Sequence, residues 1–173
     1  ILTIGQIYIA QNIINKTNNT ENTQMMPQEI NNSSQTAEAT GEKTITGETE
    51  TLKEEYTTTD SDKSAILVEN GGNATIEGAT ISKTGGDSTN TENSEFYGIN
   101  SGILVTQNST ATIKNATIET NAKGSNAVFS TGTDSKIYIN DSKINTTGSS
   151  SSRGLDATYG GYIEAENVEI TTK

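Results

Sequence analysis

The chain has 173 residues, of which 29% are hydrophobic and 5% aromatic, too few large apolar side chains for an ordinary compact core. Its net charge of −11 opposes contact with phosphate groups, which excludes nucleic acid and anionic lipid surfaces as expected partners. Because the chain holds neither cysteine nor histidine, disulfides, Cys/His zinc sites and histidine-dependent nucleophiles are excluded as well.

Residues 1–40 form an apolar start followed by a polar segment. The first ten, ILTIGQIYIA, are too few to span a bilayer and lack the basic start of a complete signal peptide. They are either the remainder of an export segment or membrane anchor, or a stray hydrophobic start. From Gln11 to Thr40 polar residues dominate without any periodicity, and the only proline, Pro27, lies here. We therefore expect a disordered stalk or linker in this segment.

Alternation of polar and apolar residues begins between Glu42 and Thr59, in the stretch EKTITGETETLKEEYTTT. Ile45, Leu52 and Tyr56 fall on one side of it, the side expected to be buried. This pattern predicts a capping half-coil over residues 41–63, ahead of the repeats that follow.

An internal repeat extends from Ser64 to Lys173. The stretch ATIEGATI (74–81) recurs as ATIKNATI (111–118), IYINDSKI (137–144) and IEAENVEI (163–170). The last isoleucines of these units are separated by 37, 26 and 26 residues. The longer first spacing indicates one polar insertion at about residues 86–94, and the fixed period of 26 residues predicts a solenoid.

Each repeat holds three short stretches that alternate with the period of a β-strand, such as those around Ile66, Ile76 and Ile81. One residue that tolerates a left-handed backbone separates the second stretch from the third: Gly78, Asn115, Asp141 and Asn167 in the four units. Three strands and three corners predict an all-β fold, a single-stranded right-handed parallel β-helix of about four coils over residues 64–173. An antiparallel sandwich would need tight hairpins between consecutive strands, and the constant strand order does not favour it.

This fold predicts three columns of inward side chains that stack from coil to coil. The first column is Ile66, Ile103, Val128 and Leu155; the second is Ile76, Ile113, Ile139 and Ala165; the third is Ile81, Ile118, Ile144 and Ile170. The corner residues are predicted to have positive φ angles.

The stretches EFYGINSGILVTQNSTATI, GSNAVFSTG and SSRGLDATYGG resemble a family of microbial right-handed β-helix repeat proteins, which are described as adhesin-like or carbohydrate-binding-domain proteins of the cell surface. The resemblance covers residues 64–173, and its most distinctive segment is Ser151–Gly161. It implies further coils beyond Lys173, so that a truncated chain is expected. It supplies no catalytic residue that could be carried over.

An outward column of apolar side chains is the candidate binding site. Alternation places Leu67, Leu104 and Phe129 outward, in line with Asp156, which is unusual for a solvated surface. One explanation is that the N-terminal segment, or Phe96 and Tyr97 of the insertion, covers this column. The other is a strip that binds a partner or glycan, with Tyr97, Arg153 and Tyr159 at its margins, because aromatic rings stack on sugars and arginine donates two hydrogen bonds at once. The predicted binding residues are Leu67, Tyr97, Leu104, Phe129, Arg153, Asp156 and Tyr159.

Catalytic, metal and cofactor sites are not expected. Glycoside hydrolysis needs two carboxylates in one groove, but Asp156 is the only acidic member of the outward column. Glu164, Glu166 and Glu169 crowd the last coil in the manner of a solvated face. Asp60 and Asp62 are the best calcium ligands, and two are too few.

These observations predict a non-enzymatic, adhesin-like module that is exported to the cell surface or the extracellular space and acts by non-covalent binding or display. The alternatives are a carbohydrate-binding module and a degenerate polysaccharide lyase or glycosidase. The expected partner is a surface glycan or a protein receptor, and the β-helix itself is not expected to insert into a membrane. The sequence leaves the oligomeric state open.

Overall fold

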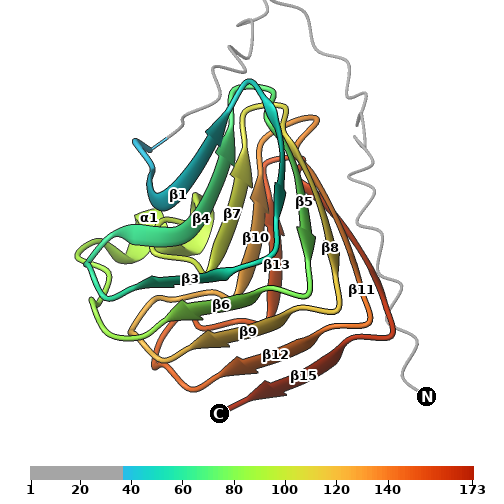
Figure 1. The fold of residues 1–173 in the computed structure, drawn as a ribbon. Helices are drawn as coiled ribbons and strands as arrows, with labels where there is room; N and C mark the ends of the chain where they lie inside the picture. Colours follow the sequence, from blue (N-terminus) through green and yellow to red (C-terminus); the bar gives the residue numbers. More distant parts are fainter. Residues whose placement is uncertain (1–36) are drawn as a thin grey trace, which may run out of the picture. The chain divides into compact units, whose positions relative to one another are not determined.

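The computed structural model describes residues 37–173, and every structural statement below concerns that part of the chain. It forms a stack of five coils, each with three β-strands (Figure 1). The first coil contains β1 (Thr40–Thr46), β2 (Thr49–Leu52) and β3 (Glu55–Thr58), and the second contains β4 (Lys63–Glu69), β5 (Asn73–Glu77) and β6 (Thr80–Lys83). The third contains β7 (Ile103–Thr106), β8 (Thr110–Lys114) and β9 (Thr117–Thr120). The last two contain β10 (Val128–Thr131), β11 (Lys136–Asn140), β12 (Lys143–Thr146), β13 (Leu155–Thr158), β14 (Tyr162–Glu166) and β15 (Glu169–Thr172).

Corresponding strands of successive coils pair in parallel to form three sheets. The first sheet has the order β1-β4-β7-β10-β13, the second β2-β5-β8-β11-β14, and the third β3-β6-β9-β12-β15. Every neighbour in a sheet therefore comes from the adjacent coil, which is the arrangement of a parallel β-helix (Figure 1). The predicted fold class is confirmed.

The three predicted columns of inward side chains are also confirmed. Ile66 pairs with Ile103, which pairs with Val128, which in turn pairs with Leu155. The second and third columns keep the same register: Ile76, Ile113, Ile139 and Ala165, then Ile81, Ile118, Ile144 and Ile170. A constant period of two within strands leaves one stacking register that places all of these side chains on the inner face. The members in the first three of these coils are buried, whereas Leu155, Ala165 and Ile170 of the last coil are partly or largely exposed.

The first coil is complete, whereas the sequence predicted only a half-coil over residues 41–63. Ile45, Leu52 and Tyr56 pair with Val68, Ile76 and Ile81, so the first coil enters all three sheets. Its pattern is obscured because Lys43 and Glu50 occupy inward positions, where the Lys43 Nζ lies 2.6 Å from the Glu50 Oε1. Inward charged side chains on an end coil hinder the pairing of a further chain with the exposed strands of that coil. Sheet edges are commonly protected in this way.

The predicted stalk lies outside the described residues except for its last part. Ala37 and Ala39 pack against a cluster of buried apolar residues that includes Leu67 and Ile99. The end of the predicted stalk is therefore a folded part of the solenoid.

The one-residue corners have the predicted left-handed backbone. The φ angles of Gly78, Asn115, Asp141 and Asn167 are 66°, 52°, 49° and 52°. Two of the corner side chains also contact each other, since the Asn167 Nδ2 donates a hydrogen bond of 2.6 Å to the Asp141 Oδ1. Each corner therefore turns the chain without interrupting the pairing between coils.

Replacing Asn115 by alanine should lower the free energy of unfolding by about 1 kcal/mol, because a Cβ-bearing residue without an amide tolerates the left-handed conformation poorly. Asn115→Gly should change it by only a few tenths of a kcal/mol, roughly. Chemical denaturation of both variants measures this difference, with Thr117→Ala on the exposed face of β9 as the control. Equal losses for the alanine and glycine variants would contradict a role of backbone conformation at this corner.

The insertion between β6 and β7 contains a short helix that the sequence did not predict. Helix α1 (Thr91–Phe96) begins after Asn90, whose side chain accepts a hydrogen bond from the Asn93 amide. The loop before it is bonded to the loop between β3 and β4, because the Asp62 carboxylate accepts a hydrogen bond of 2.9 Å from the Thr89 amide. The insertion is therefore a fixed structural element.

Lys83 is a fully buried lysine at the base of this insertion. It occupies an inward position of β6, between Thr58 and Thr120 of the neighbouring coils. Its Nζ donates hydrogen bonds to the carbonyl oxygens of Asp60 (2.6 Å), Gly85 (2.7 Å) and Gly86 (2.9 Å). The ammonium group thus ties the start of the insertion to the loop between the first and second coils.

Candidate functional site

The outward apolar column forms a second hydrophobic core. Leu67, Leu104 and Phe129 are only 1%, 1% and 0% exposed, and they pack with Ile99 of the insertion. The prediction that these three side chains contact a ligand is therefore wrong, because the insertion and the segment before β1 cover them. Of the two residues expected to form this cover, Tyr97 packs against the cluster, whereas Phe96 is largely exposed.

The aromatic residues at the margin of this cover form an exposed stacked pair. The rings of Tyr97 and Tyr159 are 5.4 Å apart between centroids and inclined by 23°. Tyr159 is 58% exposed, so one side of the pair is open to solvent. The hydrogen-bonded contact with Tyr159 is the main cause that raises the pKa of the Tyr97 hydroxyl above its ordinary value. Two residues predicted separately, one in the insertion and one after β13, are therefore in direct contact.

The backbone of Tyr159 is in the left-handed region, with φ of 50°. The residue directly after the first strand of each coil has this conformation, and in the other four coils it is Gly47, Asn70, Gln107 and Gly132. The left-handed conformation is sterically unfavourable for a bulky aromatic residue, whereas glycine and asparagine adopt it with little strain. Backbone strain is often found at functional sites, so Tyr159 is a candidate binding residue.

The end of helix α1 is fixed on the last two coils next to this pair. The carbonyl oxygen of Phe96 accepts a hydrogen bond of 2.6 Å from the Thr158 hydroxyl and one of 3.3 Å from the Thr131 hydroxyl. The Thr158 hydroxyl lies 2.8 Å from that of Thr131. Because Thr158 directly precedes Tyr159, these bonds determine where Tyr97 meets its partner.

Charged side chains complete the margin. The Arg153 Nη1 donates a hydrogen bond of 3.1 Å to the Asp156 Oδ2, and its Nη2 lies 4.0 Å from the Glu95 Oε1. The Ser151 hydroxyl donates a hydrogen bond of 2.8 Å to the same Glu95 oxygen. Burial raises the pKa of the Asp156 carboxyl above its ordinary value, while the charge of Arg153 opposes the rise. Ser150 and Ser151 also have positive φ angles, so the loop that presents Arg153 is strained as well.

We define the aromatic patch as Glu95, Phe96, Tyr97, Arg153, Asp156 and Tyr159. Four of the predicted binding residues, Tyr97, Arg153, Asp156 and Tyr159, lie in it. The sequence did not assign Glu95 to a site, because the insertion occurs once and has no counterpart in the repeat. The only available signal was its position next to Phe96 and Tyr97 in the stretch EFYG.

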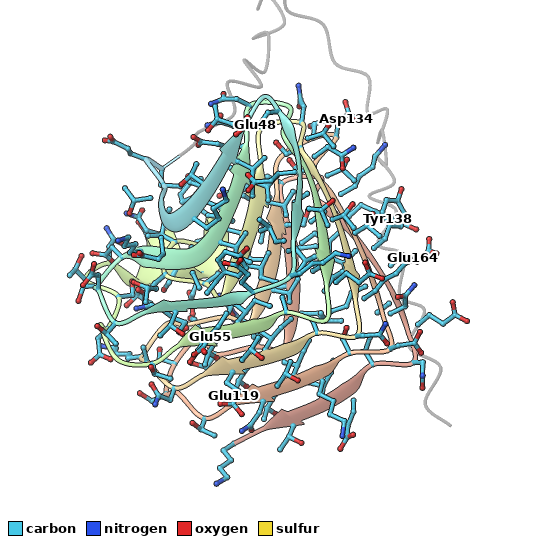
Figure 2. The ribbon with its side chains drawn as sticks, viewed as in Figure 1. Glu48, Glu55, Glu119, Asp134, Tyr138 and Glu164 are labelled. Carbon is cyan, nitrogen blue, oxygen red and sulfur yellow. The ribbon has the colours of Figure 1, made fainter. Side chains whose placement is uncertain are left out.

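A second exposed aromatic pair lies elsewhere, on the outer face of the second sheet. The rings of Tyr138 (β11) and Tyr162 (β14) are 6.0 Å apart between centroids and inclined by 58°, and the Tyr162 hydroxyl donates a hydrogen bond of 2.8 Å to the Glu164 Oε2. Figure 2 shows Tyr138 and Glu164 projecting outward from this sheet. Both tyrosines have an ordinary strand backbone, so cross-strand packing accounts for the pair.

No family model, curated protein or solved structure matches the chain in the three comparisons made with known proteins. Within residues 37–173, no group of three or more acidic, histidine or cysteine side chains is placed to hold a metal ion. In the same residues, no helix has the length and apolar character to cross a membrane. A β-helix hosts both enzymes and binding proteins, so the fold itself does not assign a function.

Proposed function

We propose that the chain is an adhesin-like recognition module of the cell surface or extracellular space, which binds a glycan non-covalently at the aromatic patch. The observation that carries this proposal is Tyr159, a bulky side chain held in a left-handed corner conformation and stacked on Tyr97 at the surface. Neither the packing of the coils nor their pairing requires a tyrosine at this corner, since the other coils have glycine, asparagine or glutamine there.

The residue types of the aromatic patch suit sugar recognition. The exposed ring of Tyr159 offers an apolar face on which the C–H face of a sugar ring packs, and its hydroxyl remains polar. Arg153, Glu95 and Asp156 supply hydrogen-bond donors and acceptors at the same margin. The rigid β-helix holds these groups in place, because each one is attached to a strand, to the helix or to a loop bonded to a neighbouring coil.

The same patch also suits a protein receptor, because tyrosine and arginine are the residues that most often dominate the affinity of protein interfaces. We favour a glycan because the open area is small: Tyr159 and Phe96 are its largest exposed apolar side chains, whereas the neighbouring apolar column is covered. A stable protein interface buries roughly 800 Å² on each partner, far more than two side chains provide.

Tyr159→Asn should weaken glycan binding strongly and leave the fold intact. We expect at least a tenfold loss of affinity, roughly, because the stacking surface is removed. The midpoint of thermal unfolding should stay within about 3 °C of the wild type, because asparagine relieves left-handed strain of about 1 kcal/mol and this offsets the lost contact with Tyr97. A glycan array followed by calorimetric titration measures the first effect, and circular dichroism the second.

Tyr162→Asn is the matched control, since it removes another exposed tyrosine, which has a strand backbone. It should leave glycan binding unchanged. Loss of binding in the control, or full binding by Tyr159→Asn, would exclude the aromatic patch as the site. Release of reducing ends or unsaturated uronates from a bound polysaccharide would instead show that the module is an enzyme.

A further inference from the structure

The charges around the aromatic patch are unbalanced toward acidic groups. Its members include two carboxylates, Glu95 and Asp156, and one guanidinium, that of Arg153. Glu92, one turn earlier in helix α1, adds a further negative charge that acts on Tyr97. The field at the stacked rings is therefore negative, in agreement with the net charge of the whole chain.

The guanidinium of Arg153 is already engaged by both carboxylates of the aromatic patch. Its Nη1 bonds the Asp156 Oδ2 at 3.1 Å, and Asp156 is more than half covered by its surroundings. An anionic ligand would have to compete with this bond and would meet Glu92 and Glu95 as like charges. Arginine therefore cannot act here as the receptor for a carboxylate, although that is its usual role in ligand recognition.

The carboxylate of Glu95 keeps capacity to accept further hydrogen bonds. Its separation of 4.0 Å from the Arg153 Nη2 exceeds the length of a hydrogen bond, so this pair is a loose ion pair. Its side chain is about one-third exposed at the surface of helix α1. Its Oε1 already accepts a hydrogen bond from the Ser151 hydroxyl, but the two oxygens of a carboxylate offer about four acceptor sites. A ligand that brings N–H or O–H donors can use the remaining sites, and an ammonium group would also be attracted to the face of a nearby tyrosine ring.

Resting on the proposed function, we propose that the aromatic patch is selective for glycans with free amino groups, accepts neutral glycans less tightly and rejects polyuronates. Glu95 is the specificity-determining residue, because it is the carboxylate least engaged by Arg153. Tyr97 and Tyr159 provide the stacking platform that all of these sugars share.

Short oligomers of β-1,4-linked glucosamine and N-acetylglucosamine test this selectivity, because they differ only in acetylation of the amine. Oligogalacturonate is the anionic comparison. Titration calorimetry of the full chain at about pH 6, where amines are protonated and carboxylates ionised, should give glucosamine oligomers an affinity about five- to tenfold higher than the acetylated ones. Oligogalacturonate should show no measurable binding.

Because any polycation is attracted to an acidic protein, the control must remove an equal charge elsewhere. Glu95→Gln should abolish the preference for the free amine and retain binding of the acetylated oligomer. Glu119 lies on the outer face of β9, in the third sheet (Figure 2). Glu119→Gln should retain the preference. Three results would overturn the proposed selectivity: equal affinities of the wild type for the two oligomers, tightest binding of oligogalacturonate, or loss of the preference in both variants. Each of them would still be compatible with glycan binding at the aromatic patch. Failure of the wild type to bind any glycan would overturn the proposed function as well.

Discussion

Phe129→Ala should lower the free energy of unfolding by about 3–5 kcal/mol, the usual cost of removing a buried aromatic ring. The ring projects from the outer face of β10, yet it is fully buried between Leu104 and the insertion. Packing around it is tight, since a Cβ added to Gly98 would lie 2.5 Å from the ring.

Urea denaturation followed by circular dichroism measures this loss, and Leu104→Ser combined with Phe129→Ser should give an even larger one. Tyr138→Ala is the control, because this residue projects from the second sheet into solvent and should change stability by less than about 1 kcal/mol. A similarly small effect of Phe129→Ala would mean that the cover over the first sheet opens easily. The outward column would then have to be reconsidered as a binding strip.

The repeated parts of the fold could be predicted from the sequence because each position is seen several times. The inward column of Ile76, Ile113 and Ile139 and the corner at Asn115 follow from a constant period combined with the strand and left-handed preferences of the residues. The first coil was underestimated because Lys43 and Glu50 stand at inward positions and interrupt the alternation. Charged inward residues protect the exposed edge of this first coil, so its pattern differs from the repeat.

The cover over the first sheet could not be predicted, because it arises from a segment that occurs once. Alternation placed Leu104 and Phe129 outward, but it carries no information on what lies beyond the sheet. The helix at Thr91–Phe96 is short and its sequence has no apolar period, so no helical signal was available. The sequence allows either a covered column or an exposed binding strip. The positions of Ile99 and Tyr97, which pack against the column, decide for the cover.

The candidate site was partly visible in the sequence. Tyr97, Arg153, Asp156 and Tyr159 were selected by residue type, which says nothing about distance. The stacking of Tyr97 on Tyr159 depends on the hydrogen bonds that Thr131 and Thr158 donate to the Phe96 carbonyl oxygen. No sequence pattern predicts these hydrogen bonds. The unusual corner at Tyr159 was available from alignment of the repeats, since the same position is Gly47 in the first coil and Gly132 in the fourth.

Lys83→Met is expected to lower the free energy of unfolding by about 2 kcal/mol, because it removes three hydrogen bonds from a charged donor to partly buried carbonyl groups. Methionine has a side chain of similar length that is tolerated in an apolar interior, so the substitution changes the buried side-chain volume only slightly. The carbonyl oxygens of Asp60, Gly85 and Gly86 lose their shared partner. Since this junction starts the insertion that carries helix α1, the variant should also weaken glycan binding at the aromatic patch. Thermal unfolding and calorimetric titration measure the two effects.

The pH dependence of the difference between wild type and Lys83→Met tests the state of the buried amine. Burial lowers the pKa of Lys83 from 10.5 to about 8, and the charges of Asp60, Asp62 and Asp87 only partly oppose this. Between these two values the unfolded chain binds a proton that the folded chain has released, so the contribution of Lys83 to stability rises with pH. The advantage of the wild type should therefore be constant below pH 8 and then grow by up to about 1.4 kcal/mol per pH unit. Other lysines and tyrosines titrate in both proteins and cancel in the difference. An advantage that stays constant up to about pH 10.5 and shrinks above it would show that the carbonyl oxygens hold the ammonium form more strongly than burial opposes it.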